Sequence, residues 1–197
     1  YDAVGNLLKK TDFSQNAANA YRYATHGSGP NAVSEVSVPL TTGCSSPAIS
    51  KAHYWYDANG NQTARQIGCA ASAASDWTDY SIDNLPRQIA RMPGFAFGIA
   101  PNAGTNPTPN NLTQFHYGPD NQRTQQLLTF DSNNKRTTLY AGSYERDTYT
   151  GLNSRIEHRY SVAPGVLLIR NTVDSTRSGL YYTHLDRLGS TSTVTKP

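Results

Sequence analysis

The sequence predicts an all-β fold made of tandem antiparallel β-hairpins. Three observations predict it: a tyrosine-led turn motif recurs, strand-like segments follow one another closely, and no window carries a sustained apolar stripe of helical period. Hydrophobic residues make up 37% of the chain, below the roughly 45–50% of ordinary globular domains. The shortfall is in aliphatic residues, since the chain has 13 Tyr but one Met. This composition suits a sheet with a half-polar surface.

The clearest hairpin lies at residues 53–65, where the strand His-Tyr-Trp-Tyr runs into the turn Asp-Ala-Asn-Gly-Asn and then into a polar strand. An Asp at the start of such a turn can bond the backbone two residues on, and Asn and Gly tolerate the positive φ of a tight reversal. Residues 1–6 repeat the pattern Tyr-Asp-x-x-Gly-Asn, which indicates an internal repeat. Its shared residues are Tyr1, Asp2, Gly5 and Asn6 in one copy and Tyr56, Asp57, Gly60 and Asn61 in the other.

Copies that match the motif only in part follow along the chain. Residues 80–89 and 115–123 each show a strand, a polar turn and a basic return strand, and the second of these turns contains Tyr117, Gly118 and Asp120. Another copy opens at Tyr23. The leading tyrosines are spaced by 22, 33, 24 and 37 residues, so we expect the hairpins to be kept while the connectors vary in length.

The chain is predicted to be a single repeat region over residues 1–197, with early hairpins at 1–90, a Pro- and Gly-rich loop at 91–113, and closely spaced hairpins at 114–197. Loops are expected at 11–20, 41–52 and 68–76, although a short helical turn is an alternative for the first. From residue 114 onward, eight strands are expected: 114–118, 122–131, 135–141, 144–150, 155–162, 165–173, 179–185 and 190–195.

These motifs resemble the YD repeats of the RHS family, which includes bacterial polymorphic toxins, the C components of insecticidal toxin complexes and, more remotely, the teneurins. Residues 138–146 are similar to the family's Tyr-x-Gly-x-Tyr-Glu-Arg segment, and residues 157–166 continue it. Residues 181–191, with His184, Asp186 and Gly189, resemble the stretch that precedes the family's core, although Arg187 stands where the family commonly has His. The resemblance covers essentially all 197 residues.

The resemblance implies that the hairpins form a curved, spiralling sheet. It also implies that this sheet is a non-catalytic shell that encloses a C-terminal toxin or effector polypeptide until a secretion system delivers it, in a secreted or bacterial cell-surface protein. The partners it implies are the rest of the parent chain and the enclosed toxin, and no cofactor is expected. Because the chain stops at Pro197, before the family's core would be complete, no autoproteolytic residue can be carried over. Unpaired strand edges would also favour self-association.

The sequence is also compatible with two other functions. A carbohydrate-binding or adhesion module would use exposed aromatic rings such as Trp55 and Trp77, whereas such rings more often pack along the sheet. An enzyme would have to use His184 and Asp186, an i, i+2 pair that on one strand shares a face and could pair imidazole with carboxylate. No hydrolase elbow, phosphate loop, dinucleotide fingerprint or zinc-protease motif occurs.

The charge, the hydropathy and the cysteine content bear on nucleic-acid binding, membrane insertion and metal binding. The net charge is +3, and the basic residues are scattered along the sequence without forming a stripe. Nucleic acid is therefore not an expected partner. No run of about 18 apolar residues predicts a membrane span. Cys44 and Cys69 flank the clearest hairpin, so either a disulfide or two free thiols is consistent with the sequence. Two isolated cysteines do not indicate a metal site.

Overall fold

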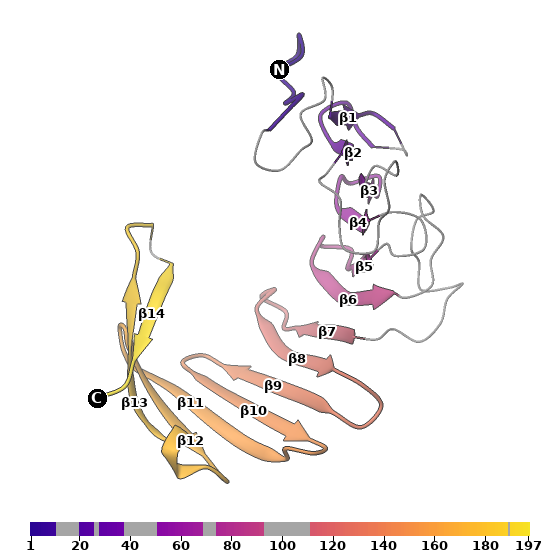
Figure 1. Ribbon diagram of the computed structural model, residues 1–197. Coiled ribbons are helices and arrows are strands. Elements are labelled where there is room, and N and C mark those ends of the chain that lie inside the picture. Colours follow the sequence, from indigo (N-terminus) through magenta and orange to yellow (C-terminus); the bar gives the residue numbers. More distant parts are fainter. Residues whose placement is uncertain (11–19, 26–27, 38–50, 69–73, 93–110, 189) are drawn as a thin grey trace. The chain divides into compact units, whose positions relative to one another are not determined.

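The structure is a computed structural model that describes residues 1–10, 20–25, 28–37, 51–68, 74–92, 111–188 and 190–197. The chain divides into two compact units, Tyr1–Leu112 and Thr113–Pro197. Each strand of a unit pairs antiparallel with its neighbours in the sequence, so the strand order follows the chain (Figure 1). This confirms the prediction of an all-β fold made of tandem antiparallel hairpins.

The first unit contains six strands in its described residues: β1 Tyr21–Tyr23, β2 Val33–Ser37, β3 Lys51–Tyr56, β4 Gln62–Gly68, β5 Ala74–Tyr80 and β6 Pro86–Met92. The turn predicted at residues 2–6 forms, but residues 7–10, which follow it, are not a strand. The loops predicted at 41–52 and 68–76 are wrong at their ends, since β3 begins at Lys51 and β5 at Ala74.

The early start of β5 has a tertiary cause. Asp76 on β5 lies between two cross-strand partners, Arg65 on β4 and Arg91 on β6. The nitrogen Nε of Arg65 lies 2.8 Å from Oδ2 of Asp76, and Nε of Arg91 lies 3.1 Å from Oδ1. Opposite charges placed directly across a ladder stabilise it. Neither partner is near Asp76 in the sequence, so the local composition of residues 68–76 indicated a loop.

The second unit holds the later strands: β7 Asn111–Tyr117, which begins just before the unit, β8 Arg123–Thr129, β9 Lys135–Ala141, β10 Tyr144–Thr150, β11 Arg155–Ala163, β12 Val166–Asn171, β13 Gly179–Leu185 and β14 Thr191–Thr195. A short 3-10 helix, η2 (Ser175–Arg177), joins β12 to β13. All eight strands predicted beyond residue 114 are present, with ends that differ by up to three residues.

The two units are packed differently. In the first unit Val36 and Ala52 are buried on one face with Tyr54 and Ile67 against them, and Trp55 is buried on the opposite face. In the described part of the second unit the buried residues are Thr138, Asp147 and Glu157, all polar. The described strands of the second unit form a single layer (Figure 1). Ladder hydrogen bonds and polar side-chain contacts, rather than an apolar core, therefore hold this layer together.

Candidate functional site

The predicted repeat turn at residues 57–61 is closed by the side chain of its aspartate. Oδ1 of Asp57 accepts hydrogen bonds from the backbone N–H groups of Asn59 and Asn61, both at 2.9 Å. Oδ2 accepts from the Asn61 side chain, also at 2.9 Å. Gly60 takes a φ of +84°, which a residue with a side chain rarely adopts. The hydrogen bond from the Asn61 side chain holds the pKa of Asp57 below its usual range.

The first copy of the motif has the same geometry. Oδ1 of Asp2 accepts from the N–H groups of Val4 and Asn6 at 3.0 and 2.8 Å, and Oδ2 accepts from the Asn6 side chain at 3.0 Å. Gly5 has a φ of +90°. The backbone hydrogen bond from Asn6 lowers the pKa of Asp2. The two sequence copies are thus two copies of one hydrogen-bonded turn.

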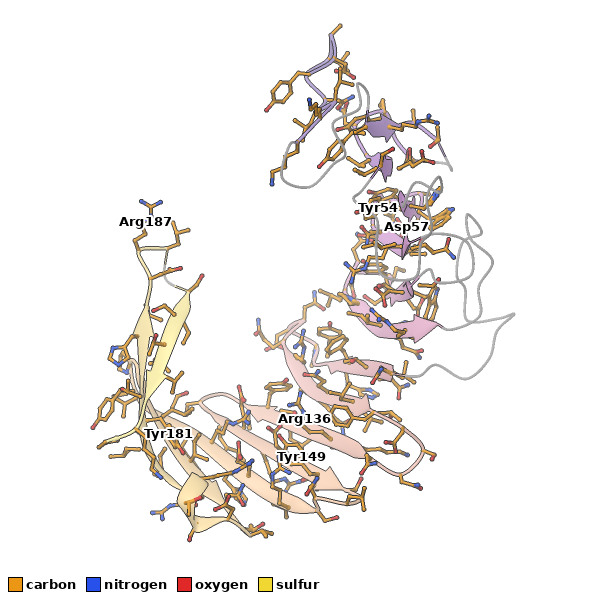
Figure 2. The ribbon with its side chains drawn as sticks, in the orientation of Figure 1. Tyr54, Asp57, Arg136, Tyr149, Tyr181 and Arg187 are labelled. Carbon is orange, nitrogen blue, oxygen red and sulfur yellow. The ribbon has the colours of Figure 1, made fainter. Side chains whose placement is uncertain are left out.

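A third copy of this turn lies at Asp186, which the sequence analysis predicts to be a structural residue of the repeat motif. Oδ1 of Asp186 accepts from the N–H groups of Leu188 and Ser190 at 2.8 and 2.9 Å. Arg187 lies in this turn, beyond the end of β13 (Figure 2). Gly189 falls outside the described residues. The offsets Asp-x-x-Gly-x are those of Asp57 to Asn61, although Leu185 stands in place of the leading tyrosine.

In two incomplete copies, other residues stand at the aspartate and glycine positions of the motif. The Ser81 hydroxyl accepts from the N–H groups of Asp83 and Leu85, both at 3.2 Å, and Asn84 supplies the positive φ of 59°. In the turn after Tyr117, Gly118 stands at the aspartate position and Asn121 takes the φ of +61°. Asp120, singled out from the sequence, accepts a hydrogen bond of 3.1 Å from the backbone N–H of Gln122.

The leading tyrosines tie each hairpin to the one before it. The hydroxyl of Tyr56 donates to the carbonyl oxygen of Val33 at 2.8 Å, and that of Tyr80 donates to the carbonyl oxygen of Gln62 at 3.1 Å. Tyr23 makes the equivalent bond to Leu7 at 2.8 Å. In each case the acceptor lies at the start of a preceding hairpin's return segment. Burial raises the pKa of each of these three tyrosines.

The turns themselves also contact one another. The side-chain amides of Asn59 and Asn61 donate to Oδ1 of Asn84 in the next hairpin, at 3.1 and 2.7 Å. In the second unit, Oδ1 of Asn134 accepts from the N–H of Leu152 at 3.1 Å across two turns. The repeat motif therefore sets both the shape of a turn and its contact with the next turn.

A row of polar residues crosses the middle of the second unit. Cross-strand pairing places Thr138 on β9 beside Asp147 on β10, and Asp147 beside Glu157 on β11. A guanidinium nitrogen of Arg159 lies 2.9 Å from Asp147 and 2.6 Å from Glu157. The Thr138 hydroxyl donates to the other oxygen of Asp147. Burial opposes the charge of Arg159, but these carboxylates outweigh it and raise the pKa of the guanidinium.

One end of the same face carries an aromatic contact. Arg136 on β9 pairs across the strands with Tyr149 on β10, and both are marked in Figure 2. The guanidinium carbon of Arg155 on β11 lies 3.5 Å from the centre of the Tyr149 ring. Arginine over an aromatic ring is an attractive contact. The face thus combines three arginines with three carboxylates, from Glu145, Asp147 and Glu157.

The structure does not bring His184 and Asp186 together as an imidazole–carboxylate pair. His184 lies on β13, and its Nε2 lies 3.0 Å from the hydroxyl of Thr195 on β14. Asp186 follows the end of β13 and uses its carboxylate in the turn. The two residues therefore do not share a strand face, because β13 ends between them.

The aromatic residues suggested for sugar contact differ in exposure. Trp55 is 9% exposed, and its ring stacks on His53 with centroids 5.8 Å apart. Trp77 lies on the same face of the sheet and is half-buried, with Ala64 between the two tryptophans in the ladder. The ring of Trp55 is therefore not open as a platform. Cys44 and Cys69 both lie outside the described residues, so their pairing stays a prediction.

The hollows of the described surface are shallow. One, of about 650 Å³, is lined by residues of β7, β8 and β9 and of the turns after β7 and β9, including Tyr117, Asp120, Arg123 and Tyr140. Across the described ranges, no cluster of three or more His, Cys, Asp or Glu could hold a metal ion. A search of the same ranges for helices long and apolar enough to span a membrane returned none.

Comparisons with known proteins give a distant likeness. No family model matches the chain, and no curated protein matches it. The crystal structure of TcdB2-TccC3 is similar over 100% of this chain, with 13% sequence identity and a TM-score of 0.46. This chain spans 13% of the length of that one.

Proposed function

We propose that this chain is a non-catalytic segment of an RHS-type shell that encloses a toxin or effector polypeptide until delivery. The observation that carries the proposal is the way each hairpin is built and joined. A tyrosine hydroxyl and a turn amide reach from one hairpin to the next, as in Tyr80 to Gln62 and Asn61 to Asn84. Nearest-neighbour ties of this kind allow a sheet to extend by repetition.

The composition of the buried positions supports an enclosing wall. The second unit buries Thr138, Asp147 and Glu157 in its described part. The Thr138 hydroxyl donates to Asp147, and Arg159 forms ion pairs with both carboxylates within the layer. Such a layer does not depend on a packed apolar core on either side. A wall of this kind can be stable beside a passenger that is not folded against it. Right-handed strand twist gives an extended sheet of hairpins its curvature.

The sequence motifs supply the second line of support. Three turns share the Asp-x-x-Gly-x arrangement, at Asp2, Asp57 and Asp186, and the last lies within the stretch that resembles the region before the RHS core. The residues singled out there have structural roles: Asp186 closes the turn and His184 contacts Thr195. A secreted or cell-surface location, a secretion system, the remainder of a parent chain and an enclosed polypeptide belong to the proposal.

A carbohydrate-binding module has less support, because Trp55 is buried against His53. A glycan array separates the two functions. Sugar-specific binding that is lost in a Trp77→Ala variant would favour the module, whereas a shell segment gives no saturable sugar binding.

Limited proteolysis of the full-length protein that contains this chain tests the shell function. We expect a passenger segment to resist protease while the repeats are folded and to become cleavable at the denaturant concentration that melts the sheet. A matched sample in which a protease site is engineered between two repeats should release the passenger after cleavage. If every segment outside the repeats is digested at the rate of an open linker, the enclosing function is wrong.

A further inference from the structure

The two faces of strands β9–β12 differ in charge. These four strands contain three acidic residues, Glu145, Asp147 and Glu157. Cross-strand pairing places all three on one face, which we call the mixed face, together with Arg136, Arg155 and Arg159. The mixed face therefore carries three charges of each sign.

The opposite face, which we call the basic face, carries no acidic residue on β9–β12. Arg146 on β10 pairs with His158 on β11, and His158 pairs with Arg170 on β12, so the three form one row across the sheet. Lys135 on β9 lies on the same face, opposite Thr150. The strands thus segregate their carboxylates from one set of cations. This segregation is invisible in the linear sequence, because the charges of the two faces alternate along each strand.

Arg146 and Arg170 have no carboxylate on their own face. Nε of Arg146 is buried and has no hydrogen-bond partner among the described residues. Arg170 is exposed. Buried guanidinium N–H groups normally have an acceptor, and a carboxylate, which can bind arginine through two oxygens, is the best match. On the mixed face, carboxylates pair with Arg159, although Nε of Arg136 and Nε of Arg155 are also buried without a hydrogen-bond partner. The two faces therefore differ in their carboxylates: the mixed face has three, and the basic face of β9–β12 has none.

An aromatic and apolar row lies beside the basic row. Tyr144 on β10 pairs with Tyr160 on β11, Tyr160 pairs with Leu168 on β12, and Leu168 pairs with Leu180 on β13. The rings of Tyr144 and Tyr160 are 5.0 Å apart, and the Tyr144 hydroxyl lies 2.7 Å from Nδ1 of His158. Tyr160 is 38% exposed and Leu180 is 41% exposed. Arginine and tyrosine beside exposed apolar side chains are typical of protein-binding surfaces.

We propose that the basic face of β10–β13 docks an acidic polypeptide segment, whose carboxylates bind Arg146 and Arg170 while its apolar side chains cover Tyr160, Leu168 and Leu180. Two strand spacings separate the arginines, about 10 Å. An extended chain advances about 3.3 Å per residue, so carboxylates a few residues apart reach both. Nucleic acids and anionic glycans offer the anions but no aliphatic side chains to cover Leu168 and Leu180.

Fluorescence anisotropy with the 197-residue chain tests the proposal. The probe is a labelled flexible peptide of Glu, Leu and Ser, and its partners are the same peptide with Glu replaced by Gln or by Lys. We expect the acidic peptide to bind more tightly than either, with an affinity that falls about tenfold in R146Q/R170Q and weakens with added salt. The charge-retaining R146K/R170K variant should keep part of the affinity.

The control variant is Arg136→Gln, which removes a cation from the mixed face of the same sheet. It should change the affinity by no more than about twofold, and circular dichroism should show that all variants stay folded. Equal binding of the Gln or Lys peptide, or unchanged binding by R146Q/R170Q, would overturn the proposal. Tighter binding of labelled oligo(dT) or of a heparin oligosaccharide than of the acidic peptide would reject a polypeptide as the occupant.

Discussion

The hydroxyl of Tyr80 donates a hydrogen bond of 3.1 Å to the carbonyl oxygen of Gln62, the first residue after the turn of the preceding hairpin. Tyr23 and Leu7 stand in the same relationship, because Leu7 follows the turn closed by Asp2. The tyrosine of the motif therefore acts on the previous repeat, while the aspartate acts on its own. This division of roles explains why the two residues stand side by side in the sequence.

Replacing Tyr80 by Phe should lower the free energy of unfolding by about 1 kcal/mol, because the ring is kept and one buried hydrogen bond is lost. Tyr1→Phe is the matched control, since Tyr1 is 84% exposed. Urea unfolding of both variants checks the prediction. An equal loss in the two variants would mean that the hydroxyl of Tyr80 contributes nothing specific.

Gly60→Ala should destabilise the chain by about 1 kcal/mol, because a side chain at a positive φ is strained. Gly60 has a φ of +84° and an added Cβ would meet nothing within 4 Å, so the cost comes from the backbone alone. Gly29→Ala is the control, because Gly29 has equally open space and no positive φ. Thermal melts should show a lower midpoint for Gly60→Ala than for Gly29→Ala, and the reverse order would contradict the turn geometry.

The turn at Asp57 should weaken in acid. The Asn61 side chain holds the folded-state pKa of Asp57 below the unfolded value of about 3.9. Its contribution is therefore complete above the unfolded pKa and is lost as the pH falls through the lower, folded pKa. NMR signals of the Asn61 side-chain amide should titrate with a midpoint below about 3.9. They should not titrate in an Asp57→Asn variant, and a midpoint above the ordinary value would show that the hydrogen bonds are not formed.

Arg159→Leu should cost about 3 kcal/mol, because it leaves the buried carboxylate of Asp147 without its cation. The side chain of Asp147 is 1% exposed. Arg87→Leu is the matched control, since Arg87 is 58% exposed and its pair with Asp79 should be worth at most about 1 kcal/mol. Removing both charges in R159L/D147L should restore part of the stability, and urea unfolding of the three variants measures it. If the double variant had a lower free energy of unfolding than R159L, the explanation by an uncompensated charge would be wrong.

The strand β14 pairs with β13 alone among the described strands, and all its residues are exposed. We expect concentration-dependent self-association through this edge. Val194→Lys should reduce it, since Val194 is 52% exposed and a charge on an edge strand opposes pairing. Light scattering over a range of concentrations measures the effect. A strict monomer at every concentration would show that this edge is not available.

The turns and strands of this fold could be predicted because their signals are local. Asp57, Gly60 and Asn61 bond one another within five residues, and the strands after residue 114 are short and separated by recognisable turns. The same local logic located Asp2 and Asn6. At Asp186 the turn chemistry is intact although no tyrosine precedes the aspartate.

The contacts between repeats could not be predicted, because their partners lie far apart in the sequence. Nothing near Tyr56 indicates that its hydroxyl will meet the carbonyl of Val33, 23 residues away. The burial of Asp147 also runs against its polarity, and only the pairing of β9, β10 and β11 supplies Thr138 and Arg159 to satisfy it. Cross-strand register, which the sequence leaves open, decides both.

The hydrogen bonds from Asn59 and Asn61 to Asn84 lie on the side of the first unit where short turns join β3 to β4 and β5 to β6. The connections from β2 to β3 and from β4 to β5 leave the sheet at the opposite ends of the strands, and their lengths differ. These connections of different length therefore join the strands at the ends opposite the contacts of Asn59 and Asn61 with Asn84. Foreign peptides inserted into the β2–β3 or β4–β5 connection should leave the pairing register of the hairpins intact. These connections are therefore suitable places to insert new sequence.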